Sequence, residues 1–159
     1  MYSRLFRLSC VALGLTCFWT AAVAATTTDL SGKWKLNVEK STFGLLPAPL
    51  NWTANITHRD PALKVETTEE TPDGPRSQVL EYTTDSKKCT NKVRDREFRS
   101  VLHWDGPVLV IETEGLYEGD PFRAVDHWTM SLDGKTITIE RHASNAYSET
   151  NQSLILEKP

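Results

Sequence analysis

The dipeptide Asp-Gly occurs three times in the chain, at 73–74, 105–106 and 133–134, and each copy separates two stretches of alternating apolar and polar residues. Asp-Gly suits a two-residue β-hairpin turn, and such alternation is typical of a strand with one buried face. No segment after residue 24 has the apolar period of an amphipathic helix. The pattern predicts consecutive hairpins, with strands at 30–38, 50–58, 62–70, 75–84, 88–94, 96–104, 107–117, 121–132, 135–143 and 149–157.

Short connections between successive strands favour an up-and-down order, and a sheet of about ten twisted strands usually closes or splits to protect its edges. We therefore expect an all-β domain, a single antiparallel up-and-down barrel of about 8–10 strands. An open sandwich of two sheets is the alternative. The one longer connection, Glu39–Pro49, contains a glycine and two prolines and is interpreted as a loop or lid.

Residues 1–24 are interpreted as a secretory signal peptide. Arg4 and Arg7 precede an apolar run that is too short to cross a bilayer, and Ala22-Val23-Ala24 offers a small-residue cleavage site. Residues 25–159 are expected to form one exported domain, soluble in the periplasm or outside the cell, with no integral membrane association. Cys89 is the only cysteine after residue 24, so stability must come from packing and backbone pairing.

The net charge of −3, with both signs interspersed, argues against nucleic acid and anionic membrane surfaces as partners. No histidine pair has the spacing of metal ligands, so neither a metal nor another cofactor is expected. A nucleophile with an adjacent base and a phosphate-binding loop are also missing. The sequence therefore assigns no catalytic residue and disfavours an enzyme.

The hairpin at 133–134 carries the most specific signal in the sequence. Pairing across this turn places Trp128 opposite Ile139 and Asp126 opposite Arg141, with all four on one face. Arg141 could anchor a ligand carboxylate or another oxyanion, with Asp126 holding the guanidinium in place. The same pair could instead be a structural latch, because buried ions must be paired whether or not they bind a ligand.

The other two Asp-Gly turns, taken as two-residue turns, place Leu102 opposite Leu109 and Val65 opposite Tyr82. Propagating this parity gives an apolar interior that also contains many polar groups. These inward polar side chains are His58, Gln78, Cys89, Asn91, Ser100, Thr113, Asp126 and Arg141. Buried polar groups need partners, so the interior is predicted to hold either a satisfied network or a cavity with water or ligand.

The segment LSGKWKLN, residues 30–37, carries a Gly-x-Trp motif at the start of the first expected strand. With HRDPALKV, HWDGPVLVIET and HWTMSLDGKTITIERH, it resembles the calycin superfamily of lipocalins, fatty-acid-binding proteins and avidins, and most closely the uncharacterised secreted bacterial lipocalin-like barrels. The resemblance implies a barrel in which Trp34 closes one end, with Arg141 a candidate to pack over it. It supplies no ligand. The lipocalin Thr-Asp-Tyr turn is missing, and the chain ends with an expected strand rather than a helix.

Five further inward residues are candidates for ligand contact. Tyr82, Asn91 and Thr113 could hydrogen-bond a ligand or belong to a water-bridged network, and Trp128 could form an apolar wall or simply fill the core. His58 could act at the barrel mouth as a donor, acid or base, or bond only to the adjacent turn.

The leading hypothesis is binding or carriage of a small apolar or amphipathic molecule. A cavity-based isomerase, cyclase or hydrolase with His58 as its base is the alternative. The third hypothesis is a structural or interaction module whose core is filled by Trp34, Trp52, Trp104 and Trp128.

Overall fold

Ten antiparallel strands make up almost all of the computed structural model, which describes residues 28–159. The proposed leader, residues 1–24, lies outside the described residues. The strands are β1 (Gly32–Leu36), β2 (Asn51–Arg59), β3 (Ala62–Thr71), β4 (Gly74–Thr83), β5 (Lys88–Val93), β6 (Arg96–Asp105), β7 (Val108–Tyr117), β8 (Asp120–Met130), β9 (Thr136–Ser144) and β10 (Glu149–Glu157). All ten predicted strands are present, with small shifts at their ends.

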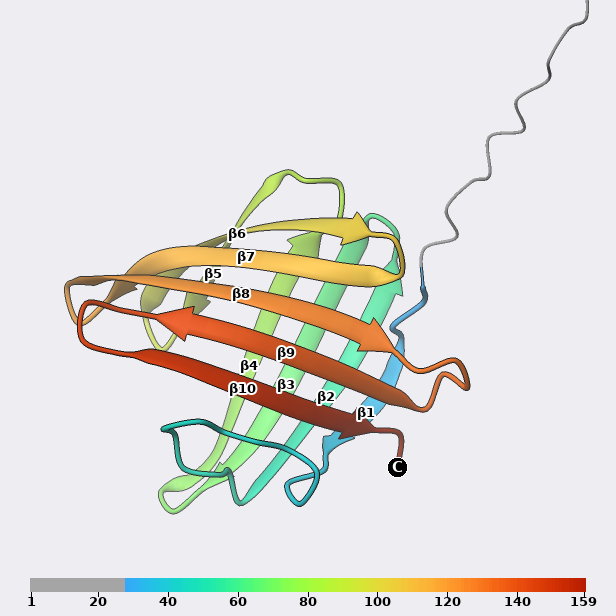
Figure 1. Cartoon of the computed structure of the whole chain (residues 1–159), viewed down its shortest axis with the longest axis horizontal. Helices are drawn as coiled ribbons and strands as arrows, with labels where there is room; N and C mark the ends of the chain where they lie inside the picture. The colour runs from blue at the N-terminus through green and yellow to red at the C-terminus, as the bar shows by residue number, and fades with distance from the viewer. Residues whose placement is uncertain (1–27) are drawn as a thin grey trace, which may run out of the picture.

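The strands form one sheet in the order β4-β3-β2-β1-β10-β9-β8-β7-β6-β5, so each is joined to the next by a hairpin except where β1 meets β10. Leu36 of β1 pairs with Leu156 of β10 and brings the two ends of the described chain together. The sheet curls until β4 approaches β5, and β7–β10 cross over β2–β4 in Figure 1. The predicted all-β up-and-down barrel is confirmed, as a nearly closed one.

Side chains, not a backbone ladder, join β4 to β5 among the described residues. The Asn91 side chain accepts a hydrogen bond from the Glu81 N–H and donates one to the Glu81 carbonyl, each at 2.9 Å. Beside it, the Thr83 N–H donates to Cys89 Sγ at 3.1 Å. The Asn91 side-chain amide thus makes the two hydrogen bonds with Glu81 that a backbone partner would make in a sheet. We call this boundary between β4 and β5, where the barrel closes, the seam.

In two hairpins the turn lies one residue away from its predicted position. Thr71 pairs with Gly74 and Asp105 with Val108, so the turns are Pro72-Asp73 and Gly106-Pro107, not Asp-Gly. In the first turn, the sequence Thr-Pro-Asp-Gly at 71–74 matches the residues preferred in a type I turn. In the second turn, Gly106 precedes a proline and has a φ of 57°, which glycine adopts readily.

Val65 consequently faces Leu80, and Leu102 faces Ile111. The shift is two residues along one strand, which keeps every side chain on its predicted face.

The third hairpin keeps its predicted register although its turn is longer than expected. The ladder ends at Met130 and Ile137, and the Ser131 N–H donates to the Thr136 carbonyl at 2.9 Å. A two-residue turn at Asp133-Gly134 would pair Leu132 with Lys135, but the ladder stops short of Leu132, whose side chain is fully exposed.

The densest packing lies in one half of the barrel, which we call the closed half. Its fully buried side chains are Leu30, Trp34, Leu63, Leu102, Leu109, Ile137 and Leu156. Trp34 donates from Nε1 to the Leu30 carbonyl at 3.1 Å, and the Lys158 Nζ lies 4.9 Å from the centre of the Trp34 ring. The cation over this tryptophan is therefore Lys158, not Arg141. Lys158 directly follows β10, the strand that pairs with β1, whereas Arg141 belongs to β9.

The connection between β1 and β2 is a loop without a helix, as predicted. It is held against β10 by an isolated bridge between Thr42 and Ser153. Gly44 has a φ of +60°, and a Cβ there would lie 2.6 Å from the Asn151 carbonyl oxygen. Only glycine fits this close approach, which fixes the loop across one side of the barrel.

Candidate ligand-binding cavity

The half of the barrel away from Trp34 contains a cavity of about 320 Å³. Its apolar walls include Trp52, Leu80, Phe98 and Phe122. Six of the seven predicted site residues line it: Tyr82, Asn91, Thr113, Asp126, Trp128 and Arg141. They come from β4, β5, β7, β8 and β9, because the inward parity of all five strands points them to the same space.

Larger hollows lie on the outer surface, and the one of about 630 Å³ runs beside the β7–β8 turn. Four of its charged groups pair with one another, Arg96 with Glu118 at 3.5 Å and Arg99 with Glu97 at 3.8 Å. The internal cavity, with its apolar walls and few polar groups, is the better candidate for a small-molecule site.

Asp126 and Arg141 form a bidentate ion pair on the cavity wall. Arg141 donates from Nε to Asp126 Oδ1 at 2.7 Å and from Nη2 to Oδ2 at 2.6 Å. The β8–β9 register places the two residues directly opposite each other. The Asp126 side chain is 9% exposed and that of Arg141 is 37% exposed, so the accessible part of the pair belongs to the guanidinium.

The charge of Arg141 is secured by its partner. Burial alone would lower the pKa of Arg141, but the charge and hydrogen bonds of Asp126 raise it overall above its ordinary value. The guanidinium therefore remains a cation in the barrel interior.

Tyr82 approaches this pair from β4. Burial raises the pKa of the Tyr82 hydroxyl far above its ordinary value, and the negative charge of Asp126 raises it further. The phenol remains protonated at physiological pH, so it can donate a hydrogen bond to a group in the cavity.

Asn91 and Thr113 line the cavity but have partners within the protein. The Asn91 amide uses its oxygen and its nitrogen on Glu81, across the β4–β5 seam. The hydroxyls of Thr113 and Ser100 lie 2.9 Å apart and bond to each other. Both residues are placed to hold the wall together first. Arg141, Tyr82 and Thr67 are lining residues whose polar groups keep capacity for a ligand.

Two phenylalanines meet at the edge of the cavity near the β7–β8 turn. The rings of Phe98 and Phe122 are 5.5 Å apart in an edge-to-face arrangement. Gly115 lies between them in the sheet, and a Cβ there would be 2.5 Å from the Phe98 ring. Gly115 was not among the predicted site residues; a glycine inside an otherwise regular strand is the signal that could have found it.

Trp128 is 6% exposed and lines the cavity with its ring. Its Nε1 is buried without a hydrogen-bond partner among the described residues. Trp52 also lines the cavity, while Trp34 lies in the closed half. The four tryptophans thus leave space in the barrel rather than filling it.

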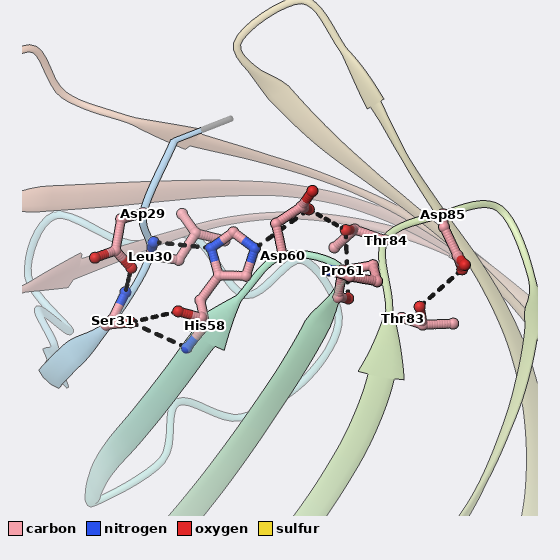
Figure 2. A network of polar contacts seen from close by, with 9 residues as sticks. All are labelled: Asp29, Leu30, Ser31, His58, Asp60, Pro61, Thr83, Thr84 and Asp85. Carbon is pink, nitrogen blue, oxygen red and sulfur yellow. Dashed lines mark hydrogen bonds and ion pairs between the residues drawn. The ribbon is translucent and has the colours of Figure 1, made fainter. Parts of the chain in front are cut away.

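His58 lies outside the cavity lining, at the end of β2 (Figure 2). It is 7% exposed, and its Nδ1 accepts a hydrogen bond from the Leu30 N–H at 3.4 Å. Its Nε2 is 3.8 Å from Asp60 Oδ1, and its ring packs 5.9 Å from that of Trp104. These contacts fasten the segment before β1 to the β2–β3 turn.

Asp60 extends this network, because it accepts a hydrogen bond from the Thr84 hydroxyl (Figure 2). The Thr84 N–H also donates to the Pro61 carbonyl at 2.8 Å. Thr84 is buried although it precedes β5 in a connecting segment, and sequence periodicity has no means of detecting such a position.

Within residues 28–159, no three His, Cys, Asp or Glu side chains come together as a metal site. No helix in the same range is long and apolar enough to cross a membrane.

No protein-family model and no curated protein sequence matches the chain. Among solved structures, it is similar to zebrafish ileal bile acid-binding protein complexed with cholic acid, at 12% identity and a TM-score of 0.59, over 82% of this chain and 98% of that one. Human cRBP IV matches at 14% identity and 0.58, over 83% and 99%. Secretory abundant heat soluble protein 4 from Ramazzottius varieornatus matches at 12% and 0.60, over 86% and 99%.

Identities this low show the fold and nothing finer. The relation that Gly-x-Trp and the string of hairpin segments suggested is confirmed at that level. The chain has the calycin, lipocalin-like fold, built as a nearly closed barrel of ten strands.

Proposed function

We propose that this protein is an exported binding protein that holds a small apolar or amphipathic molecule inside its barrel. The observation that carries the proposal is the internal cavity of about 320 Å³, lined mainly by apolar side chains around one ion pair. Small-molecule sites commonly combine such walls with a few convergent polar groups.

The structural neighbours support the proposal. One is described with cholic acid, and a Schistosoma mansoni fatty acid binding protein, similar at a TM-score of 0.52, is described with arachidonic acid. Because identity is only 12% in both cases, their ligands are not transferred to this chain. What they support is that a barrel of this kind can enclose an amphipathic molecule.

The proposed roles follow from placement. The aromatic and aliphatic walls would take the body of the ligand, while the Arg141 guanidinium and the Tyr82 hydroxyl would orient its polar end. Asp126 would position Arg141, because its two oxygens accept two of the guanidinium hydrogens.

The direct test is native mass spectrometry of the protein purified from its own host. We expect co-purified mass on the wild-type protein that Arg141→Ala loses while its circular dichroism spectrum persists. A folded wild-type protein that carries no additional mass and binds nothing from a host lipid extract would contradict the proposal.

A cavity-filling variant gives a sharper comparison. Ala124 lines the cavity on β8, and Val125 follows it on the outer face. Ala124→Phe should occupy the space and abolish ligand uptake, whereas Val125→Phe adds a ring to the same strand outside the barrel and should not. Equal uptake by both variants would show that the ligand lies elsewhere.

Export is a separate part of the proposal, supported by the leader-like residues 1–24. Expression of the whole gene in its host should yield, outside the cytoplasm, a protein whose intact mass corresponds to a start near Ala25. Recovery of the uncleaved chain from the cytoplasm alone would contradict export and would leave ligand binding unaffected.

A further inference from the structure

The cavity holds no net charge. Among the residues that the structure describes, Asp126 and Arg141 are the only charged side chains that line it, and both oxygens of the carboxylate bond to the guanidinium. The phenol of Tyr82 stays neutral in this setting. A ligand placed beside Arg141 therefore meets a cation whose charge is already balanced at a distance of 2.6–2.7 Å.

The cavity retains hydrogen-bond donors that its own walls do not use. A guanidinium carries five N–H groups. Among the described residues Arg141 donates to Asp126 alone, from Nε and Nη2. No described residue accepts a hydrogen bond from the Tyr82 hydroxyl, which lies in the same cavity. Beside the ion pair the free groups are the Arg141 N–H groups and the Tyr82 hydroxyl, so they favour a ligand head that accepts hydrogen bonds. The Thr67 hydroxyl also lines the cavity without a partner among the described residues, and it can either donate or accept.

The cost of desolvating a ligand's polar head, compared with the attraction of that head to the cavity, then distinguishes charged from uncharged ligands. A carboxylate must lose its hydration to enter, at a cost of several kcal/mol, and attraction to Arg141 is opposed by repulsion from Asp126. An ammonium group meets the same cost and offers no acceptor. A hydroxyl or carbonyl costs much less to bury and regains that cost through the free donors.

From these observations we infer that the ligand is an uncharged amphiphile whose head accepts hydrogen bonds, such as an alcohol, a ketone or an ester, and that a carboxylate is the weaker ligand. The inference rests on the proposed function and names the ligand class for that same cavity. It replaces the expectation that Arg141 anchors a carboxylate. A cavity of about 320 Å³ also limits the body to one short chain or a small ring system, because it is at the lower end of small-molecule sites.

Isothermal titration calorimetry at neutral pH with 1-decanol, decanoate and decylammonium tests the class, because the three share one chain and differ in the charge of the head. The wild-type protein should bind 1-decanol at least about tenfold more tightly than either ion. Asp126→Asn should leave the Arg141 charge unbalanced, so that decanoate gains about tenfold or more and becomes the tightest of the three.

Glu140→Gln is the matched control. Glu140 is next to Arg141 on β9 but is exposed on the outer face, where it accepts a hydrogen bond from Ser153. This variant also removes one carboxylate, and it should keep the wild-type order of affinities.

The possible outcomes distinguish the inference from the proposed function. Decanoate binding to the wild-type protein as tightly as 1-decanol overturns the inference and leaves a binding protein. Binding of none of the three overturns both. Should Asp126→Asn fail to fold, the wild-type order still decides, together with Tyr82→Phe, which should weaken 1-decanol by roughly fivefold through the loss of one donor.

Discussion

At the scale of single residues, the Asp126–Arg141 pair shows how an ion pair can lie on the inward face of a barrel. Both oxygens of the nearly buried carboxylate are bonded, and the guanidinium keeps a surface toward the cavity. The hairpin pattern was sufficient to predict that the two residues face each other. It could not predict the cavity beside them, because the cavity depends on the side chains that seven other strands, β2–β7 and β10, contribute to its lining.

The energetic role of the pair can be measured by a double-mutant cycle. Asp126→Ala should destabilise the protein by up to about 3–5 kcal/mol, since it leaves a charge in the interior without its partner, and the access of Arg141 to the cavity should reduce that cost. Asp126→Ala combined with Arg141→Met should cost less than the sum of the single changes. Urea unfolding gives these values.

A surface pair provides the comparison. Lys40 and Glu157 lie 2.7 Å apart with the lysine side chain 64% exposed, so Lys40→Met should cost about 1 kcal/mol or less. Equal costs for Lys40→Met and Asp126→Ala would show that the interior pair is as well solvated as the surface pair.

Tyr82 predicts how stability changes at high pH. Its pKa in the folded protein is raised above the ordinary value of 10.0, so unfolding becomes easier once the pH allows the unfolded chain to lose that proton. The contribution is fully present below pH 10.0 and is lost as the pH rises toward the folded pKa. Tyr82→Phe should remove this part of the alkaline loss in urea unfolding measured across pH, whereas Tyr147→Phe, at a tyrosine that is 84% exposed, should retain it.

At the scale of elements, the β4–β5 seam is the place where, within residues 28–159, the barrel closes through side chains and not through a backbone ladder. Asn91→Ala removes both bonds to Glu81 and should cost about 1–3 kcal/mol. Hydrogen exchange at the Glu81 amide should become much faster, because its acceptor is lost.

Asn55 is the control for this prediction. Its side chain bonds to Glu66 on the exposed face between β2 and β3, where the backbone ladder is complete. Asn55→Ala should therefore leave exchange at β2 and β3 unchanged. If Asn91→Ala also left the Glu81 amide protected, another group would have to close the seam.

The hairpins show what local sequence can and cannot specify. Turn chemistry identified all three Asp-Gly hairpins, but proline beside the dipeptide moved two of the turns by one residue. The side chains remained on their predicted faces because the resulting shift in pairing is even. Asn91 was a candidate either for ligand contact or for a water-bridged network. Its use in the seam could not be foreseen, since the approach of β4 to β5 is a property of the closed barrel.

At the scale of the whole molecule, we expect the closed half of the barrel to contribute most to stability and the half with the cavity to contribute most to ligand binding. Leu109 is fully buried in the closed half, so Leu109→Ala should cost about 2–5 kcal/mol in urea unfolding and leave ligand affinity little changed. Leu80 lines the cavity and already lacks neighbours on one side, so Leu80→Ala should cost less stability and weaken binding more. The reverse order would mean that the cavity half carries the core.

The sequence by itself determined the strands, the faces that their side chains occupy and the pairing of Asp126 with Arg141, because these depend on a period of two and on the turns between neighbours. The tertiary structure decided which inward residues surround empty space and which are packed. Arg141, Tyr82 and Trp128 line the cavity. His58 lies outside it and makes the contacts that hold the segment before β1, and Lys158, not Arg141, lies over Trp34. These outcomes depend on the curvature and closure of a ten-stranded sheet, which bring together residues that no local pattern relates.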